Sequence, residues 1–205
     1  MLNRYFKPGK ENVDFMYANM AIQNIYFAIA SLEYILYHDN YDIGIFHDDH
    51  TFYFFHIQSV LTACGNISNI FNSTSSKSYA RSTRLCKKLN INTSQYPLTF
   101  KKEIRNTNEH FDERYEEFDC NIGDYNIIFE DTDELMKSTI YSNYHLRTYD
   151  KTTNTYYTYN KKKVLISCNL KDLYDELIEL RTLITENPLS ESGWVDEDPH
   201  NIISE

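Results

Sequence analysis

Three residues near the middle of the chain have the side chains needed to handle a phosphate: Arg105, Asn106 and His110. They lie in residues 101–120, a stretch without Pro or Gly. A guanidinium can hold a phosphate through two parallel hydrogen bonds, and an imidazole titrates near neutral pH and can transfer a proton. If the stretch is helical, Asn106 and His110 project from the same side because they are four residues apart. This set could therefore hold a phosphate, orient it and transfer a proton.

The apolar residues of the same stretch predict the helix that would position this set. They recur at spacings of seven, four and three residues, which marks one face of an amphipathic helix. The residues on this face are Ile104, Phe111, Tyr115 and Phe118. Thr99 stands just before the stretch and is a suitable N-cap.

The order of these residues resembles a known family. Arg105-Asn106, three further residues and His110 resemble the arginine–histidine signature of HEPN domains, and the run Phe-Asp-Glu-Arg after His110 is similar to that of bacterial HEPN-like proteins. The resemblance implies a homodimeric helical bundle that cleaves RNA without a metal or cofactor, at a composite site in which Arg105, Asn106 and His110 are catalytic. It also implies RNA, and a protein partner such as an antitoxin, as binding partners. Position 112 is Asp, whereas members paired with nucleotidyltransferase antitoxins often have Tyr there.

A second interpretation is a non-catalytic module of the same architecture, a homodimeric binding or scaffold protein. In that case Arg105, Asn106 and His110 make structural hydrogen bonds and ion pairs with the acids around them. Glu109, Asp112 and Glu113 flank the motif, and their charge would repel phosphate and raise the pKa of His110.

Charge along the chain is uneven. The formal net charge is −10, which argues against general nucleic-acid binding. The segment before the motif is locally basic, and its candidate RNA-phosphate ligands are Arg81, Arg84, Lys88, Lys101 and Lys102. These cations form either a patch that binds successive phosphates of an RNA backbone or an ordinary solvent-exposed basic surface. The acids concentrate in residues 109–135 and after Glu186.

Cysteine usage and hydropathy point to a cytoplasmic protein. The four cysteines, Cys64, Cys86, Cys120 and Cys168, show no metal-ligand spacing and sit in or beside apolar stretches, which predicts buried free thiols. The cluster His47-Asp48-Asp49-His50 is better explained by helix capping than by a metal. No apolar run approaches the roughly 20 residues that cross a bilayer, so no membrane partner is expected.

Hydrophobic periodicity predicts a mainly α protein, a HEPN-like bundle of four to five helices. The first helix runs from Asp14 to about Tyr37, the second from Asp48 or Asp49 to about Phe71, and a shorter one covers Tyr79 to Leu89. On the first helix, Met16, Met20 and Phe27 are expected on the core face, together with Ile25, Ile29, Leu32, Ile35 and Leu36. On the second, the expected core residues are Phe55, Val60, Leu61, Cys64, Ile67, Ile70 and Phe71. With the motif helix, these form a bundle core over residues 14–120 after a lead-in of residues 1–13.

The pattern changes after the motif helix. Residues 121–168 read as an acidic loop followed by a small antiparallel β-hairpin or sheet, with strands near Tyr144–Tyr149, Thr155–Tyr159 and Val164–Cys168. A last helix over residues 169–187 is capped by Asn169 and packs on the bundle through a stripe of apolar residues: Leu170, Leu173, Leu177, Leu180 and Ile184. Residues 188–205 carry no Lys or Arg and are expected to form a flexible acidic tail.

Overall fold

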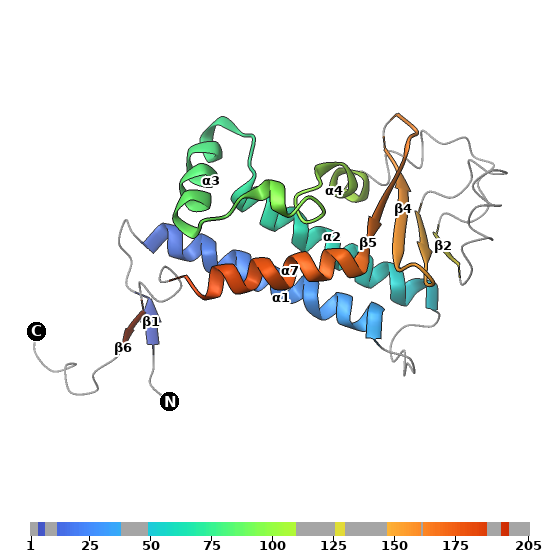
Figure 1. Cartoon of the computed structure of the whole chain (residues 1–205), viewed down its shortest axis with the longest axis horizontal. Coiled ribbons are helices and arrows are strands. Elements are labelled where there is room, and N and C mark those ends of the chain that lie inside the picture. Colours follow the sequence, from blue (N-terminus) through green and yellow to red (C-terminus); the bar gives the residue numbers. More distant parts are fainter. Residues whose placement is uncertain are drawn as a thin grey trace, which may run out of the picture.

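The structure is a computed structural model of the whole chain, and it describes residues 4–6, 12–37, 49–109, 126–129, 147–160, 162–187 and 194–196. Within these ranges the protein is mainly helical with a small sheet at one end (Figure 1). The predicted fold class is therefore confirmed at that level. Residues 38–48, the second half of the predicted motif helix and the predicted acidic loop after it lie outside the described residues, apart from one short strand.

Three long helices form the body of the molecule. These are α1 (Asn12–Tyr37), α2 (Asp49–Phe71) and α7 (Leu170–Thr185), and α1 packs against both of the others. Their shared interior is closed to solvent and consists of aliphatic side chains such as Ile25, Leu32, Ile57 and Leu177. Each helix contributes one apolar stripe, so the three stripes can only be buried together.

The last helix forms as its sequence predicts. The side chain of Asn169 accepts hydrogen bonds from the backbone N–H groups of Lys171 and Asp172, which satisfies the free donors of the first turn. The five residues of the predicted stripe, Leu170, Leu173, Leu177, Leu180 and Ile184, are all fully or almost fully buried.

The core face of α1 differs from the prediction. Met16, Met20 and Phe27 are exposed, and on α2 Phe55 is exposed as well. Small residues take their place in the α1 interior: Ala18, Ala21 and Ala28 are buried, and so is Ala63 on α2. Small side chains let two helices approach closely, so α1 is rotated with these alanines inward and Met16, Met20 and Phe27 outward. The other residues predicted for its core face are buried or partly buried: Ile25, Ile29, Leu32, Ile35 and Leu36.

Two shorter helices lie across the long ones. α3 (Ser76–Leu89) begins earlier than expected and buries Leu85 and Leu89 as predicted. It ends at Asn90, whose φ of 56° places it in the left-handed region that asparagine tolerates. A 3-10 turn (Thr93–Gln95) then leads to α4 (Lys102–Glu109), which packs on α2.

Among the described residues, the sheet contains a strand that the sequence does not predict, β2 (Asn126–Phe129). The strand order is β2, β3 (Arg147–Asp150), β4 (Thr155–Tyr159) and β5 (Leu165–Asn169). The last three are antiparallel as expected, whereas β2 pairs in parallel with β3, Ile127 opposite Thr148. Two parallel strands such as β2 and β3 need a long connection between them. No short turn therefore marks their pairing in the sequence.

The two ends of the chain also meet. β1 (Arg4–Phe6) pairs antiparallel with β6 (Trp194–Asp196), and Figure 1 shows this ribbon beside the end of the bundle. The sequence predicts a lead-in and a flexible tail there, because a three-residue strand is too short to show a period.

Among the described residues, no helix combines the length and apolar character that a membrane span requires.

Candidate functional site

The first half of the predicted motif helix is α4. Ile104 is 2% exposed and faces α2, which fixes how this short helix is rotated. Arg105 and Asn106 follow it on the same helix, and Asn106 is half-buried. His110 and the side chain of Arg105 lie outside the described residues, so the three-residue constellation stays a prediction.

The segment that leads into α4 is held by a carboxylate of α7. Glu176 accepts hydrogen bonds from the backbone N–H groups of Leu98 and Thr99 and from the Thr99 hydroxyl, at 2.8–3.1 Å. Thr99 is buried and its hydroxyl is used in this contact. The prediction that Thr99 caps the motif helix is therefore wrong. The helix begins three residues later, at Lys102.

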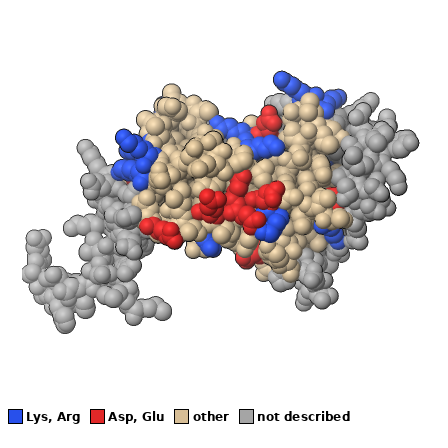
Figure 2. All heavy atoms as spheres, viewed as in Figure 1, with Lys and Arg blue, Asp and Glu red and all other residues tan. Residues whose placement is uncertain are grey.

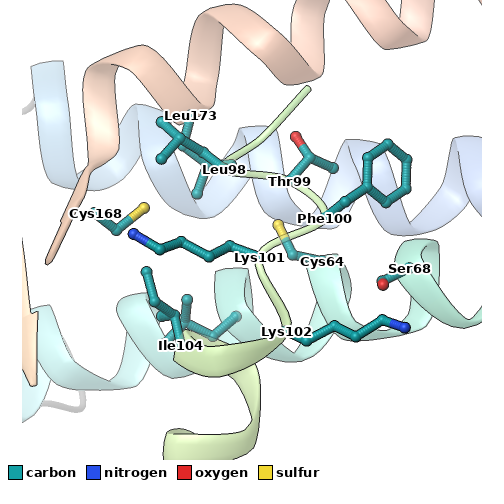
Figure 3. A pocket seen from close by; sticks show the side chains of 11 residues that line it. Cys64, Ser68, Leu98, Thr99, Phe100, Lys101, Lys102, Ile104, Cys168 and Leu173 are labelled. Atoms are coloured by element: carbon teal, nitrogen blue, oxygen red, sulfur yellow. The ribbon is translucent and has the colours of Figure 1, made fainter. Parts of the chain in front are cut away.

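Two lysines of the predicted phosphate patch stand at the start of α4. The Lys101 Nζ donates to the backbone carbonyl of Ser167 on β5 at 3.0 Å. Figure 3 shows the Lys101 side chain extending between Cys64 and Cys168, while Lys102 points the other way. The pocket that they line holds about 10 Å³, room for one water molecule at most. It is too small to admit a nucleobase.

The described cysteines are free, and two of them border this pocket. Cys64 and Cys168 are buried and Cys86 is partly buried. Burial raises the pKa of the Cys64 thiol and raises that of Cys168 to about 12. Both thiols are therefore neutral at physiological pH, which suits a packing role and gives poor nucleophiles.

The remaining predicted RNA ligands lie on α3 and contact α1. Arg84 donates to both carboxylate oxygens of Asp14, with Nη2 2.6 Å from Oδ1, and the Lys88 Nζ lies 2.8 Å from Oδ2. Asp14 is 4% exposed. The hydrogen bond from Arg84 is the main reason that the pKa of this carboxyl lies below its ordinary value. Asp14 thus pairs with two cations and does not cap its helix.

Arg81 completes the contact between these helices. Its guanidinium stacks over the Tyr17 ring, 4.2 Å from the centroid, and donates to the Tyr17 hydroxyl and to the backbone carbonyl of Asn69. The side chains of Arg84 and Lys88 keep 48% and 40% of their surface exposed. Phosphate binding by these three residues stays a prediction, and in this structure all three also join α3 to the body of the protein.

The other candidate ligands of the sequence do not form a metal site in the part of the chain that is described. No group of three His, Cys, Asp or Glu side chains converges there. In the His47–His50 cluster, the side chains fall outside the described residues. His56 is buried within an aromatic cluster, stacked on Tyr34 and edge-on to Phe52 and Phe55, and burial lowers its pKa.

A groove between α1 and α2 is a feature that the sequence analysis missed. It has a volume of about 740 Å³ and is lined from α1 by Asn24, Phe27, Ala30 and Ser31, and from α2 by Phe55, Gln58, Ser59, Thr62, Ala63 and Asn66. The signal that could have revealed it is the scarcity of charge in residues 12–37 and 49–71.

Charged side chains gather elsewhere on the molecule. Figure 2 shows acidic side chains over the middle of the face that α7 forms, with lysines and arginines at its margins. The acids of α7 and its C-cap are Asp172, Asp175, Glu176, Glu179 and Glu186.

Comparison of the chain with protein-family models, with curated proteins and with solved structures gave no match. The resemblance to HEPN domains stays a prediction from the motif around Arg105 and His110.

Proposed function

We propose that this protein is a metal-independent endoribonuclease of the HEPN type, with Arg105, Asn106 and His110 as its catalytic residues. The observation that supports the proposal is that Arg105 and Asn106 follow one another on α4, a helix fixed by buried Ile104 on one side and by the Glu176 contact at its entry. A rigid helix holds catalytic groups in the alignment that proton transfer needs.

The proposed reaction uses the ribose 2′-hydroxyl as nucleophile. His110 takes its proton, and the 2′-oxygen attacks the adjacent phosphorus while the bond from phosphorus to the 5′-oxygen breaks. The 5′-oxygen leaves with the proton that the His110 imidazolium returns. Arg105 neutralises the charge that develops on the phosphoryl oxygens, and Asn106 orients the phosphate or the imidazole. The products would be a 2′,3′-cyclic phosphate and a 5′-hydroxyl end.

The test is incubation of a mixture of RNAs with the protein in EDTA, with product ends identified by mass. His110→Ala should lower the cleavage rate by about 100-fold or more, since it removes the proton-transfer group. Glu103→Gln is the matched control, because Glu103 is an exposed residue of the same helix outside the motif. Equal cleavage by His110→Ala, or a need for divalent metal, would contradict the proposal.

The second candidate function is a non-catalytic binding module. The observation that favours it is that Arg81, Arg84 and Lys88 contact Tyr17, Asn69 and Asp14, which ties the basic face of α3 into the fold. The acidic surface over α7 (Figure 2) is also unsuited to RNA. If wild-type protein leaves every RNA intact while it binds a protein partner, this candidate replaces the nuclease.

A further inference from the structure

Ser68 is a buried serine of α2 whose hydroxyl is not satisfied. The residue is 3% exposed, and no group of the described residues makes a hydrogen bond with its Oγ. A serine inside a helix can bond the carbonyl four residues earlier, as Ser59 of the same helix does with Phe55. Ser68 does not, although a buried hydroxyl without a partner costs free energy. Such a group indicates a ligand that the described part of the chain does not supply.

The Ser68 hydroxyl lies in the pocket between α2 and the start of α4. Figure 3 shows it at the end of the pocket toward which the Lys102 side chain extends. Lys102 is the first residue of α4 and is half-buried. The first N–H groups of an α-helix have no partner within the helix, and this end of the helix carries partial positive charge. A hydroxyl, an ammonium group and a helix start therefore direct hydrogen-bond donors toward one small space.

The charge on the walls of this pocket is positive. Among the described residues that line it, the charged ones are Lys101 and Lys102, and the others are neutral. The carboxylate of Glu176 does not line the pocket, and it already accepts hydrogen bonds from the segment before α4. Glu103, in the first turn of α4, is exposed. Most of the remaining wall is apolar, and away from water an attraction between opposite charges is stronger.

We propose that the pocket binds a monoatomic anion, chloride in ordinary solution, between the Ser68 hydroxyl of α2 and the Lys102 ammonium and first turn of α4. Size selects this class of ligand. The pocket holds about 10 Å³, which admits one particle of roughly the size of water, so phosphate, sulfate and the phosphates of a nucleic acid do not fit. A chloride ion is slightly larger than water, and the flexible Lys102 side chain forms part of the wall and can adjust to it.

A water molecule suits this position less well than an anion. Water needs acceptors for its two hydrogens, whereas the ammonium group of Lys102 and the backbone at the start of α4 offer donors. The thiols of Cys64 and Cys168, which also line the pocket, are weak acceptors. An anion accepts from every donor at this end of the pocket and needs no acceptor in return.

The bound anion joins the motif helix to the body of the protein. α4 packs on α2, and its Ile104 is buried. The ion adds a second contact between the same two helices, at the first turn of α4. The concentration of chloride therefore sets how firmly α4 is held, and with it Arg105 and Asn106. This effect does not require that the protein cleave RNA, so the anion site and the nuclease can fail separately.

The test is urea unfolding of the full chain while chloride replaces gluconate at constant pH and ionic strength. Gluconate is too large for the pocket and serves as the reference anion. Chloride should stabilise wild type: the unfolding equilibrium constant should fall about tenfold when chloride is at about ten times its dissociation constant. Bromide should act like chloride, whereas inorganic phosphate should act like gluconate.

Two variants, each with a matched control, locate the effect. Ser68→Ala removes only the hydroxyl and Lys102→Gln removes the ammonium charge, and each should weaken chloride binding about tenfold or more, because a hydrogen bond to a charged group is lost. Ser59→Ala is the control for the first, since Ser59 is another serine of α2. Lys87→Gln is the control for the second, since Lys87 is an exposed lysine of α3. Both controls should keep the wild-type response to chloride.

All variants should keep the wild-type helical circular dichroism, and either folded pocket variant is sufficient for the comparison. The proposal is overturned if chloride stabilises wild type no more than it stabilises Ser68→Ala or Lys102→Gln. It is also overturned if Lys87→Gln loses the response as strongly as Lys102→Gln, which would show general screening of charge. A response to phosphate as large as the response to chloride would overturn the assignment of a monoatomic ligand.

Discussion

Asp14 shows how one buried charge can connect distant parts of the chain. Its partners Arg84 and Lys88 are 70 and 74 residues away in sequence. No periodic pattern relates residues so far apart, and the sequence predicts Asp14 only as the start of the first helix. The structure instead pairs it with two cations of α3, so the carboxylate is satisfied although it is nearly closed to solvent.

At the residue scale, we expect Asp14→Asn to lower the free energy of unfolding by about 1–3 kcal/mol at neutral pH, because charged hydrogen bonds are lost from a buried acceptor. Glu33→Gln, an exposed change on the same helix, should have little effect. Urea unfolding of both variants and of wild type measures these differences in the free energy of unfolding. A loss no larger for Asp14→Asn than for Glu33→Gln would show that the pairing contributes nothing to stability.

The pH dependence of this contribution has a definite sign. The pKa of Asp14 is lowered in the folded protein, whereas in the unfolded chain it lies near 3.9. The contribution is therefore complete above the unfolded value and is lost as pH falls through the folded one. The difference in stability between wild type and Asp14→Asn should shrink in acid, and a difference that stays constant to pH 2 would contradict the assignment.

At the scale of elements, α7 and its contact with the segment before α4 illustrate what sequence can and cannot reveal. The cap at Asn169 and the apolar stripe are local, so both were predicted correctly. The contact from Glu176 to Leu98 and Thr99 joins residues 77–78 apart, and nothing local marks it. β2 was also missed because its pairing with β3 is not local in sequence. The exposure of Phe27 and Phe55 was missed because it depends on how α1 is rotated against α2, which a single helix does not reveal.

We expect Glu176→Ala to loosen the entry to α4 while α7 stays folded through its buried leucines. The backbone amides of Leu98 and Thr99 lose their acceptor, which costs about 1–3 kcal/mol. Hydrogen exchange should become faster at these amides and in α4, but not in the centre of α7. Asp175→Asn is the control, since its ion pair with Lys171 is exposed and contributes little. Unchanged exchange before α4 would mean that other contacts hold this helix.

At the scale of the whole molecule, the composite site that the resemblance implies predicts that RNA cleavage depends on the association of two chains. The cleavage rate per chain should fall when the protein is diluted until sedimentation equilibrium shows the 24.4 kDa mass of a single chain, because each chain then lacks half of the site. A rate per chain that stays constant across this dilution would show that one α4 acts alone.

The hydrogen bond from Lys101 to Ser167 also has a consequence for behaviour at high concentration. β5 is an outer strand of the sheet, and the backbone of such a strand is a template on which another chain can add a strand. Lys101 occupies one of these carbonyls and brings a positive charge to the strand. The residue that introduces the motif helix thereby also hinders strand-by-strand aggregation of the sheet.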